Sequence, residues 1–161
     1  MTVKKMKRRA ILAFVQDKPG TLNKISMMIR RKMYNVDTLT VCKAKPPGVS
    51  RMTITLREDD EARVTQVIRQ LEKCTEVIRA KELDRDHSYW REVAIIKFEL
   101  DSKKLEKLEK KYQFEILDSQ PHDIHIIQIA GLTDRLDGFL EELGVEHLIE
   151  IARTGVTALE K

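Results

Sequence analysis

The chain has 161 residues, of which 42% are hydrophobic, 35% charged and 5% aromatic. This length suits one ordinary domain or two small ones, and the hydrophobic content is too high for a disordered tail. The formal net charge of +4 comes from 30 basic and 26 acidic residues that are interleaved along the chain, which argues against a face built to bind nucleic acid.

Cysteine use and hydropathy indicate a cytoplasmic protein. Cys42 and Cys74 lie far apart in the sequence and form neither a CxxC motif nor a disulfide framework. No apolar stretch reaches the roughly 20 residues that a membrane span needs. The one basic cluster, Lys4 to Arg9, is interpreted as a solvated arm.

The first elements in chain order are a strand, a turn and a helix. An apolar run from Arg8 to Val15 ends at Asp17-Lys18-Pro19-Gly20, which is typical of a strand that stops in a turn. Apolar residues then recur at helical spacing and predict a helix that ends near Lys32: Leu22, Ile25 and Ile29.

A predicted hairpin follows this helix. The β-branched run from Asn35 to Val41 predicts a strand in which Val36 and Thr38 face one side and Asp37, Leu39 and Val41 the other. Pro46-Pro47-Gly48 reverses the chain, and a second alternating strand contains Met52, Ile54 and Leu56. A helix around residues 61–71 and a strand at 75–83 complete the first half.

The second half repeats this order after a polar stretch at residues 84–89. We expect strands at 91–100, 114–118, 124–130 and 147–152, with helices at 101–111 and 132–143. Two successive βαββαβ units predict an α+β protein of two tandem ferredoxin-like domains, residues 1–83 and 84–161, with antiparallel sheets and helices on one face. Because the other face of each sheet is left over, this architecture favours an oligomer or a partner protein.

A catalytic or metal site is not predicted. No serine lies in a nucleophile-elbow context, and neither cysteine has a histidine close in sequence. His122 and His125 differ in parity along an extended strand and would point to opposite faces. We therefore expect a protein that is not an enzyme.

The turn from Asp17 to Leu22 is the best local candidate for a binding site. Gly20 removes a side chain where a helix begins, so the free N–H groups near Gly20, Thr21 and Leu22 could approach the carboxylate of an amino acid, and Asp17 could bind its ammonium group. Taken alone, the motif is more typical of an ordinary helix start with Pro19 at its first position.

The whole chain resembles the small regulatory subunits of acetohydroxyacid synthase (acetolactate synthase), which are ACT-domain proteins. The resemblance lies in segments spread over nearly all of the sequence: residues 11–22, 31–41, 50–54, 91–97, 116–118, 130–131, 136–140 and 150–156. It implies an N-terminal ACT domain that forms a homodimer and binds a feedback inhibitor, usually valine, at the interface. The C-terminal domain is then expected to engage and stimulate the catalytic subunit.

The resemblance also implies site residues and cofactors. The effector site would use Asp17, Gly20, Thr21 and Leu22 of one chain, with Asn35 and Val36 of its neighbour, and the effector would be valine, leucine or isoleucine. Thiamine diphosphate, Mg and FAD are expected only on the catalytic subunit. The alternative is a free-standing ACT-type amino-acid sensor that regulates another enzyme or DNA binding.

Overall fold

The structure is a computed structural model that describes residues 6–161. The first six elements alternate as predicted: β1 (Arg8–Gln16), α1 (Thr21–Arg31), β2 (Val36–Lys43), β3 (Val49–Arg57), α2 (Glu61–Glu72) and β4 (Val77–Glu82). The strands form an antiparallel sheet in the order β2-β3-β1-β4, so that β2 and β4 are its edges. This order is that of a ferredoxin-like βαββαβ unit and confirms the predicted fold class.

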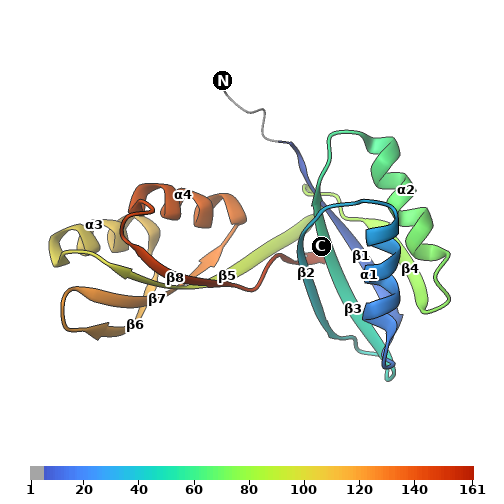
Figure 1. The fold of residues 1–161 in the computed structure, drawn as a ribbon, viewed down its shortest axis with the longest axis horizontal. Helices are drawn as coiled ribbons and strands as arrows, with labels where there is room; N and C mark the ends of the chain where they lie inside the picture. Colours follow the sequence, from blue (N-terminus) through green and yellow to red (C-terminus); the bar gives the residue numbers. More distant parts are fainter. Residues whose placement is uncertain (1–5) are drawn as a thin grey trace. The chain divides into compact units, whose positions relative to one another are not determined.

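Both helices of this unit cover the same face of its sheet (Figure 1). α1 buries Ile25 and α2 buries Leu71, and both side chains have no exposed surface. They belong to one core with the strand residues Ile11 and Ile54, which are directly opposed in the β1–β3 register. The apolar side chains that recur at helical spacing therefore pack against the apolar side chains that alternate along the strands.

The other face of this sheet is also buried, contrary to the prediction that it is left over. Ala10 and Thr55 have no exposed surface, and Leu12 and Thr53 are at most 3% exposed. The last residues of the chain lie on this face, since both backbone polar groups of Val156 form hydrogen bonds with side chains of β2.

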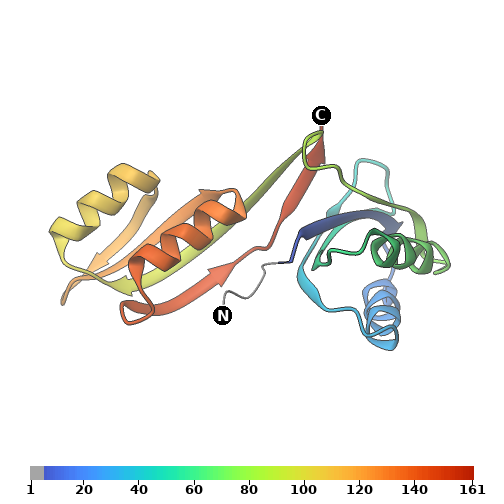
Figure 2. The same ribbon diagram turned by 90° about the horizontal axis from the view of Figure 1, so that it is seen from above.

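The second set of elements repeats the same order: β5 (Ser88–Glu99), α3 (Ser102–Tyr112), β6 (Glu115–Gln120), β7 (Ile124–Gly131), α4 (Thr133–Leu143) and β8 (Leu148–Arg153). The sheet order is β6-β7-β5-β8. Figure 2 shows α3 and α4, in yellow and orange, on one face of this sheet. Phe139 is fully buried there and makes edge-on contacts with the rings of Phe98, Tyr112 and Phe114. On the opposite face Ile95 is 45% exposed, so this second sheet does leave a face uncovered.

The chain divides into two compact units, and its C-terminal end belongs to the first. One unit runs to Tyr89 and includes Val156–Lys161, and the other is Trp90–Gly155. The sequence predicts a single division, between residues 83 and 84. The structure also contains a strand that the sequence does not predict, β9 (Thr157–Glu160), which pairs with β5.

Two further findings concern membrane-spanning helices and the basic cluster. Within residues 6–161 no helix is both long and apolar enough to cross a lipid bilayer. Lys4 and Lys5 of the basic cluster lie outside the described residues. Arg8 forms an ion pair with Asp37 at 3.0 Å and Arg9 one with Glu82 at 2.9 Å. These two arginines therefore support the sheet edges.

Candidate functional site

The turn that precedes α1 is open at its backbone. Gly20 is the N-cap residue, with φ of 87° and ψ of −11° in the left-handed region, and no side chain caps the helix. The first helical bond runs from Lys24 N–H to Gly20 C=O at 3.0 Å. The N–H groups of Leu22 and Asn23 therefore remain available at the positive end of the helix, whose first turn contains no acidic residue.

Gly20 is required by its backbone conformation. A Cβ atom at this position would meet nothing within 4 Å in the described chain. The positive φ is nevertheless costly for any residue with a side chain. The turn itself is held by a hydrogen bond of 2.8 Å from Asp17 N–H to Gly48 C=O, and Asp17 is exposed.

Thr21 and Leu22 differ in their exposure. The Thr21 hydroxyl donates a hydrogen bond of 3.0 Å to Gln16 C=O, and the residue is 5% exposed. Its side chain therefore attaches the turn to β1, and its N–H donates a hydrogen bond of 3.2 Å to Lys18 C=O, so neither group of Thr21 is free to bind a ligand. Leu22 is 47% exposed and offers an apolar side chain at the start of the helix.

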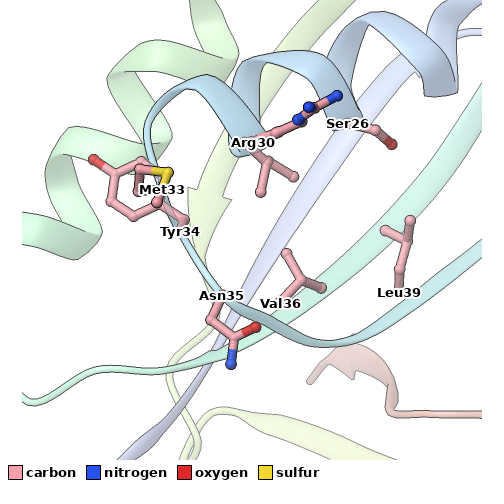
Figure 3. Close-up of a pocket in the computed structure, with 8 residues that line it drawn as sticks. Ser26, Arg30, Met33, Tyr34, Asn35, Val36 and Leu39 are labelled. Carbon is pink, nitrogen blue, oxygen red and sulfur yellow. The ribbon is translucent and has the colours of Figure 1, made fainter.

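Asn35 and Val36 lie at the opposite end of α1 from this turn. α1 has 11 residues and is about 16 Å long, so the chain separates the six predicted site residues into two groups. Asn35 and Val36 belong to a cavity of about 520 Å³ between the second half of α1 and the start of β2 (Figure 3). The cavity is lined by Ser26, Ile29, Arg30, Met33, Tyr34, Asn35, Val36 and Leu39.

The cavity combines an apolar floor with a polar rim. Ile29, Val36 and Leu39 contribute to the floor and pack with the core of the first unit. Ser26, Arg30 and Asn35 are exposed and supply a hydroxyl, a guanidinium and an amide. Such a set suits a small ligand with an apolar body and a charged head group.

A β-bulge brings Val36 into this cavity and corrects the alternation predicted for β2. The register with β3 shifts between Val36 and Thr38, so Val36 opposes Leu56 while Leu39 opposes Ile54. Val36 therefore faces the helices together with Leu39, and Thr38 and Thr40 face the other side. The prediction that Val36 and Thr38 share a face is wrong because the bulge adds one residue to the strand.

Sequence reasoning missed the contribution of α1 to the cavity. Ser26 and Arg30 are four residues apart and share one face of the helix, which was a usable signal. Met33 lies in the turn after α1 with a φ of 59°, and no pattern in the sequence predicts that it lines the cavity.

The described residues contain no obvious reactive centre. No three His, Cys, Asp or Glu side chains within residues 6–161 are arranged to hold a metal. Ser119 and His125 are joined at 3.1 Å, but the other ring nitrogen of His125 is bound to Leu100 C=O at 3.1 Å. His125 is 6% exposed, so this pair satisfies polar atoms within the second unit.

Two tandem ferredoxin-like units, the first with a pocket between its helix and edge strand, define an ACT-type protein. The family described as "AHAS small subunit-like ACT domain" matches residues 11–79, and the one described as "Small subunit of acetolactate synthase" matches residues 91–161. These two matches follow the two halves of the chain.

Similar proteins agree with both matches. The small subunit of acetolactate synthase isozyme 3 from Salmonella typhimurium is 30% identical, over 96% of each chain. The acetolactate synthase small subunit of Bacillus subtilis is 27% identical, over 96% of this chain and 91% of that one. The crystal structure of the acetolactate synthase small subunit from Thermotoga maritima superimposes with a TM-score of 0.86 at 27% identity, over 97% of this chain and 98% of that one. The chain belongs to the acetolactate synthase small-subunit family, and the resemblance seen in its sequence is confirmed.

Proposed function

We propose that this chain is a non-catalytic subunit that stimulates the catalytic subunit of acetolactate synthase and transmits feedback inhibition by a branched-chain amino acid. The observation that carries this proposal, beside family membership, is the cavity between α1 and β2, with an apolar floor and a polar rim. Thiamine diphosphate, Mg and FAD are assigned to the catalytic partner. An effector that binds both states of the assembly equally would shift nothing, so it must favour the inhibited state.

The effector site is completed across a homodimer. β2 is an edge strand, and Val41 on it is 47% exposed, as is Leu22 at the start of α1. α1 runs back along β2, so that its N-terminal turn lies at the end where β2 finishes. Antiparallel pairing of two β2 strands would place Asn35 and Val36 of one chain beside Gly20 of the next, and it would join the two groups of site residues.

The two groups offer complementary chemistry to an amino acid. The free N–H groups at the start of α1 suit a carboxylate, because the helix end is partly positive. The Asp17 carboxylate and the Asn35 amide oxygen suit an ammonium group. Val36 and Leu39 offer apolar surface to a branched side chain.

Reconstitution tests this function directly. Acetolactate formation from pyruvate is measured for the catalytic subunit of the same organism, alone and with this chain, and then with valine, leucine or isoleucine added. We expect a higher rate with the chain and a loss of that rate with at least one of the three amino acids. If the chain neither binds the catalytic subunit nor changes its rate, a free-standing amino-acid sensor becomes the better explanation.

A further inference from the structure

The C-terminal residues form a strap across the first sheet, on the face away from its helices. We use the word strap for Val156–Lys161. Thr40 Oγ1 donates a hydrogen bond of 3.0 Å to Val156 C=O, and Val156 N–H donates one of 3.3 Å to Thr38 Oγ1. Lys81 Nζ lies 2.7 Å from both carboxylate oxygens of Glu160. The strap is therefore attached to β2 at one end and to β4 at the other.

The strap is packed against this face as well as hydrogen-bonded to it. Val156 is 1% exposed and Ala158 is fully buried, whereas Thr157 and Leu159 between and beyond them are exposed. This alternation is that of a strand with one buried side. In Figure 3 the C-terminal strand lies on the side of the sheet opposite α1, below β2.

Thr38 links the strap to the interior of the sheet. Its hydroxyl lies 2.6 Å from that of Thr55, which is fully buried, and Thr38 N–H donates a hydrogen bond of 3.0 Å to Thr55 Oγ1. The Thr38 hydroxyl thus joins the Val156 amide and the Thr55 hydroxyl in one network. Hydrogen bonds in such a network polarise one another, so the displacement of one group changes the strength of the other bonds.

Thr38 also stands next to the candidate effector site. The β-bulge between Val36 and Thr38 is the point where the β2–β3 ladder is interrupted. Asn35 and Val36 precede the bulge. Thr38 and Thr40 follow it, on the face of the sheet that the strap covers. Because a bulge weakens pairing locally, a displacement of Asn35 and Val36 meets little resistance from the ladder before it reaches Thr38.

We propose that Thr38 and Thr40 are coupling residues, which pass the effect of a ligand at the Asn35–Val36 end of β2 to the strap. The strap follows Gly155 directly, and Gly155 is the last residue of the second unit. A change in the two hydrogen bonds of Val156 therefore displaces the segment that connects β8 to the strap. This inference rests on the proposed function and adds a route by which the effector signal leaves the first unit.

The test compares three variants of the full chain in the reconstituted enzyme. Thr38→Val with Thr40→Val removes both hydroxyls that hold Val156. Deletion of residues 156–161 removes the strap and leaves the sheet sequence intact, which keeps the test decisive if the double variant folds poorly. Thr157→Val is the matched control, since Thr157 is an exposed strap residue whose side chain makes no hydrogen bond in the described chain.

Coupling and binding are measured separately. We expect the double variant and the deletion to bind the effector, by calorimetry on the chain alone, within about twofold of the native chain. The concentration for half-inhibition of the reconstituted enzyme should rise at least about fivefold, the lower end of typical coupling between sites. Thr157→Val should behave as the native chain. Unchanged half-inhibition in both the double variant and the deletion would overturn the proposal.

A readout without the catalytic subunit keeps this inference distinct from the proposed function. Hydrogen exchange of residues 156–161 is followed in the native chain with and without valine. A change in exchange on binding supports the coupling, and unchanged exchange despite measured binding counts against it. If none of valine, leucine or isoleucine binds at all, the effector part of the proposed function fails, and the coupling fails with it.

Discussion

The guanidinium of Arg153 donates hydrogen bonds of 2.9 Å to both carboxylate oxygens of Glu92, whose side chain is only 1% exposed. Arg153 also bonds to Asp137 at 2.9 Å. These contacts, with the hydrogen bond to Glu92 as the largest cause, raise the pKa of Arg153. Glu92 lies on β5 and Arg153 at the end of β8, so the pair fixes two strands of the second unit next to Gly155, where the strap begins.

Loss of Arg153 should destabilise the second unit. Arg153→Ala leaves Glu92 as an unpaired buried carboxylate, and breaking such a pair costs about 3–5 kcal/mol. Arg153 itself is 27% exposed, so water can reach the site and we expect a value near 3 kcal/mol. Glu92→Gln should lower the free energy of unfolding by less, because it removes the buried negative charge instead of leaving it without a partner. Urea unfolding followed by circular dichroism measures both.

A matched control uses an ion pair at the surface. Lys81 and Glu160 are 44% and 47% exposed, so Lys81→Ala should change the free energy of unfolding by no more than about 1 kcal/mol. Equal losses for Arg153→Ala and Lys81→Ala would show that burial of Glu92 contributes nothing to the strength of its pair.

The order of elements was predictable because alternation and helical spacing were both regular. Ile11 and Ile54 on the strands and Ile25 on α1 all follow these periods and all reach the core. The bulge before Thr38 was not predictable, because the residues around it alternate as though the strand were uninterrupted. Only pairing with β3 shows the extra residue.

The strap and half of the cavity depend on contacts between distant parts of the chain. Thr157–Glu160 has no β-branched run, and its strand conformation comes from pairing with β5. The cavity needs Ser26 and Arg30 of α1 beside Leu39 of β2, which no local pattern brings together. The turn at Gly20 was found from sequence because its glycine and proline are local signals.

Gly20 offers a test of the effector site that separates strain from charge. Gly20→Ala and Gly20→Asp both place a side chain at a φ of 87°, at a cost of about 1–2 kcal/mol, and a Cβ atom there meets nothing within 4 Å. Only Gly20→Asp adds a negative charge where the effector carboxylate would lie. We expect Gly20→Asp to abolish inhibition while stimulation of the catalytic subunit persists.

The alanine variant should retain a weaker response, with half-inhibition at a higher effector concentration. Inhibition curves for the native chain and both variants with the catalytic subunit give the comparison. A Gly20→Asp chain that is inhibited as strongly as the native one would place the effector elsewhere.

His87 should titrate at a higher pH than an ordinary histidine. Its Nδ1 lies 2.6 Å from Asp84 Oδ2, and this hydrogen bond is the main cause that raises the pKa of His87 and lowers that of Asp84. A raised folded pKa stabilises the fold fully below the unfolded value of about 6.5. That contribution is lost as the pH rises through the folded pKa.

NMR titration of the His87 ring measures this effect. Asp84→Asn should move the pKa of His87 down toward the value of a free histidine, since it removes the carboxylate. The effect on stability should be small, because both side chains are exposed, at 80% and 61%. A His87 pKa that does not respond to Asp84→Asn would mean that the pair does not persist in solution.

The edge strand β2 allows dimerisation and effector binding to be tested together. Val41→Glu places a carboxylate at a 47% exposed edge position, where pairing of two β2 strands would bury it without a counterion. We expect the dissociation constant of the dimer, measured by sedimentation, to rise at least about tenfold, which is about 1.4 kcal/mol. Val145→Glu, at an 84% exposed position of the second unit, adds the same charge outside β2 and should leave the dimer intact. Because Asn35 and Gly20 lie at opposite ends of α1, a monomer carries only half of the proposed site, and valine affinity should fall together with dimerisation. A monomeric Val41→Glu chain that binds valine as tightly as the native dimer would show that the cavity beside Asn35 is sufficient within one chain.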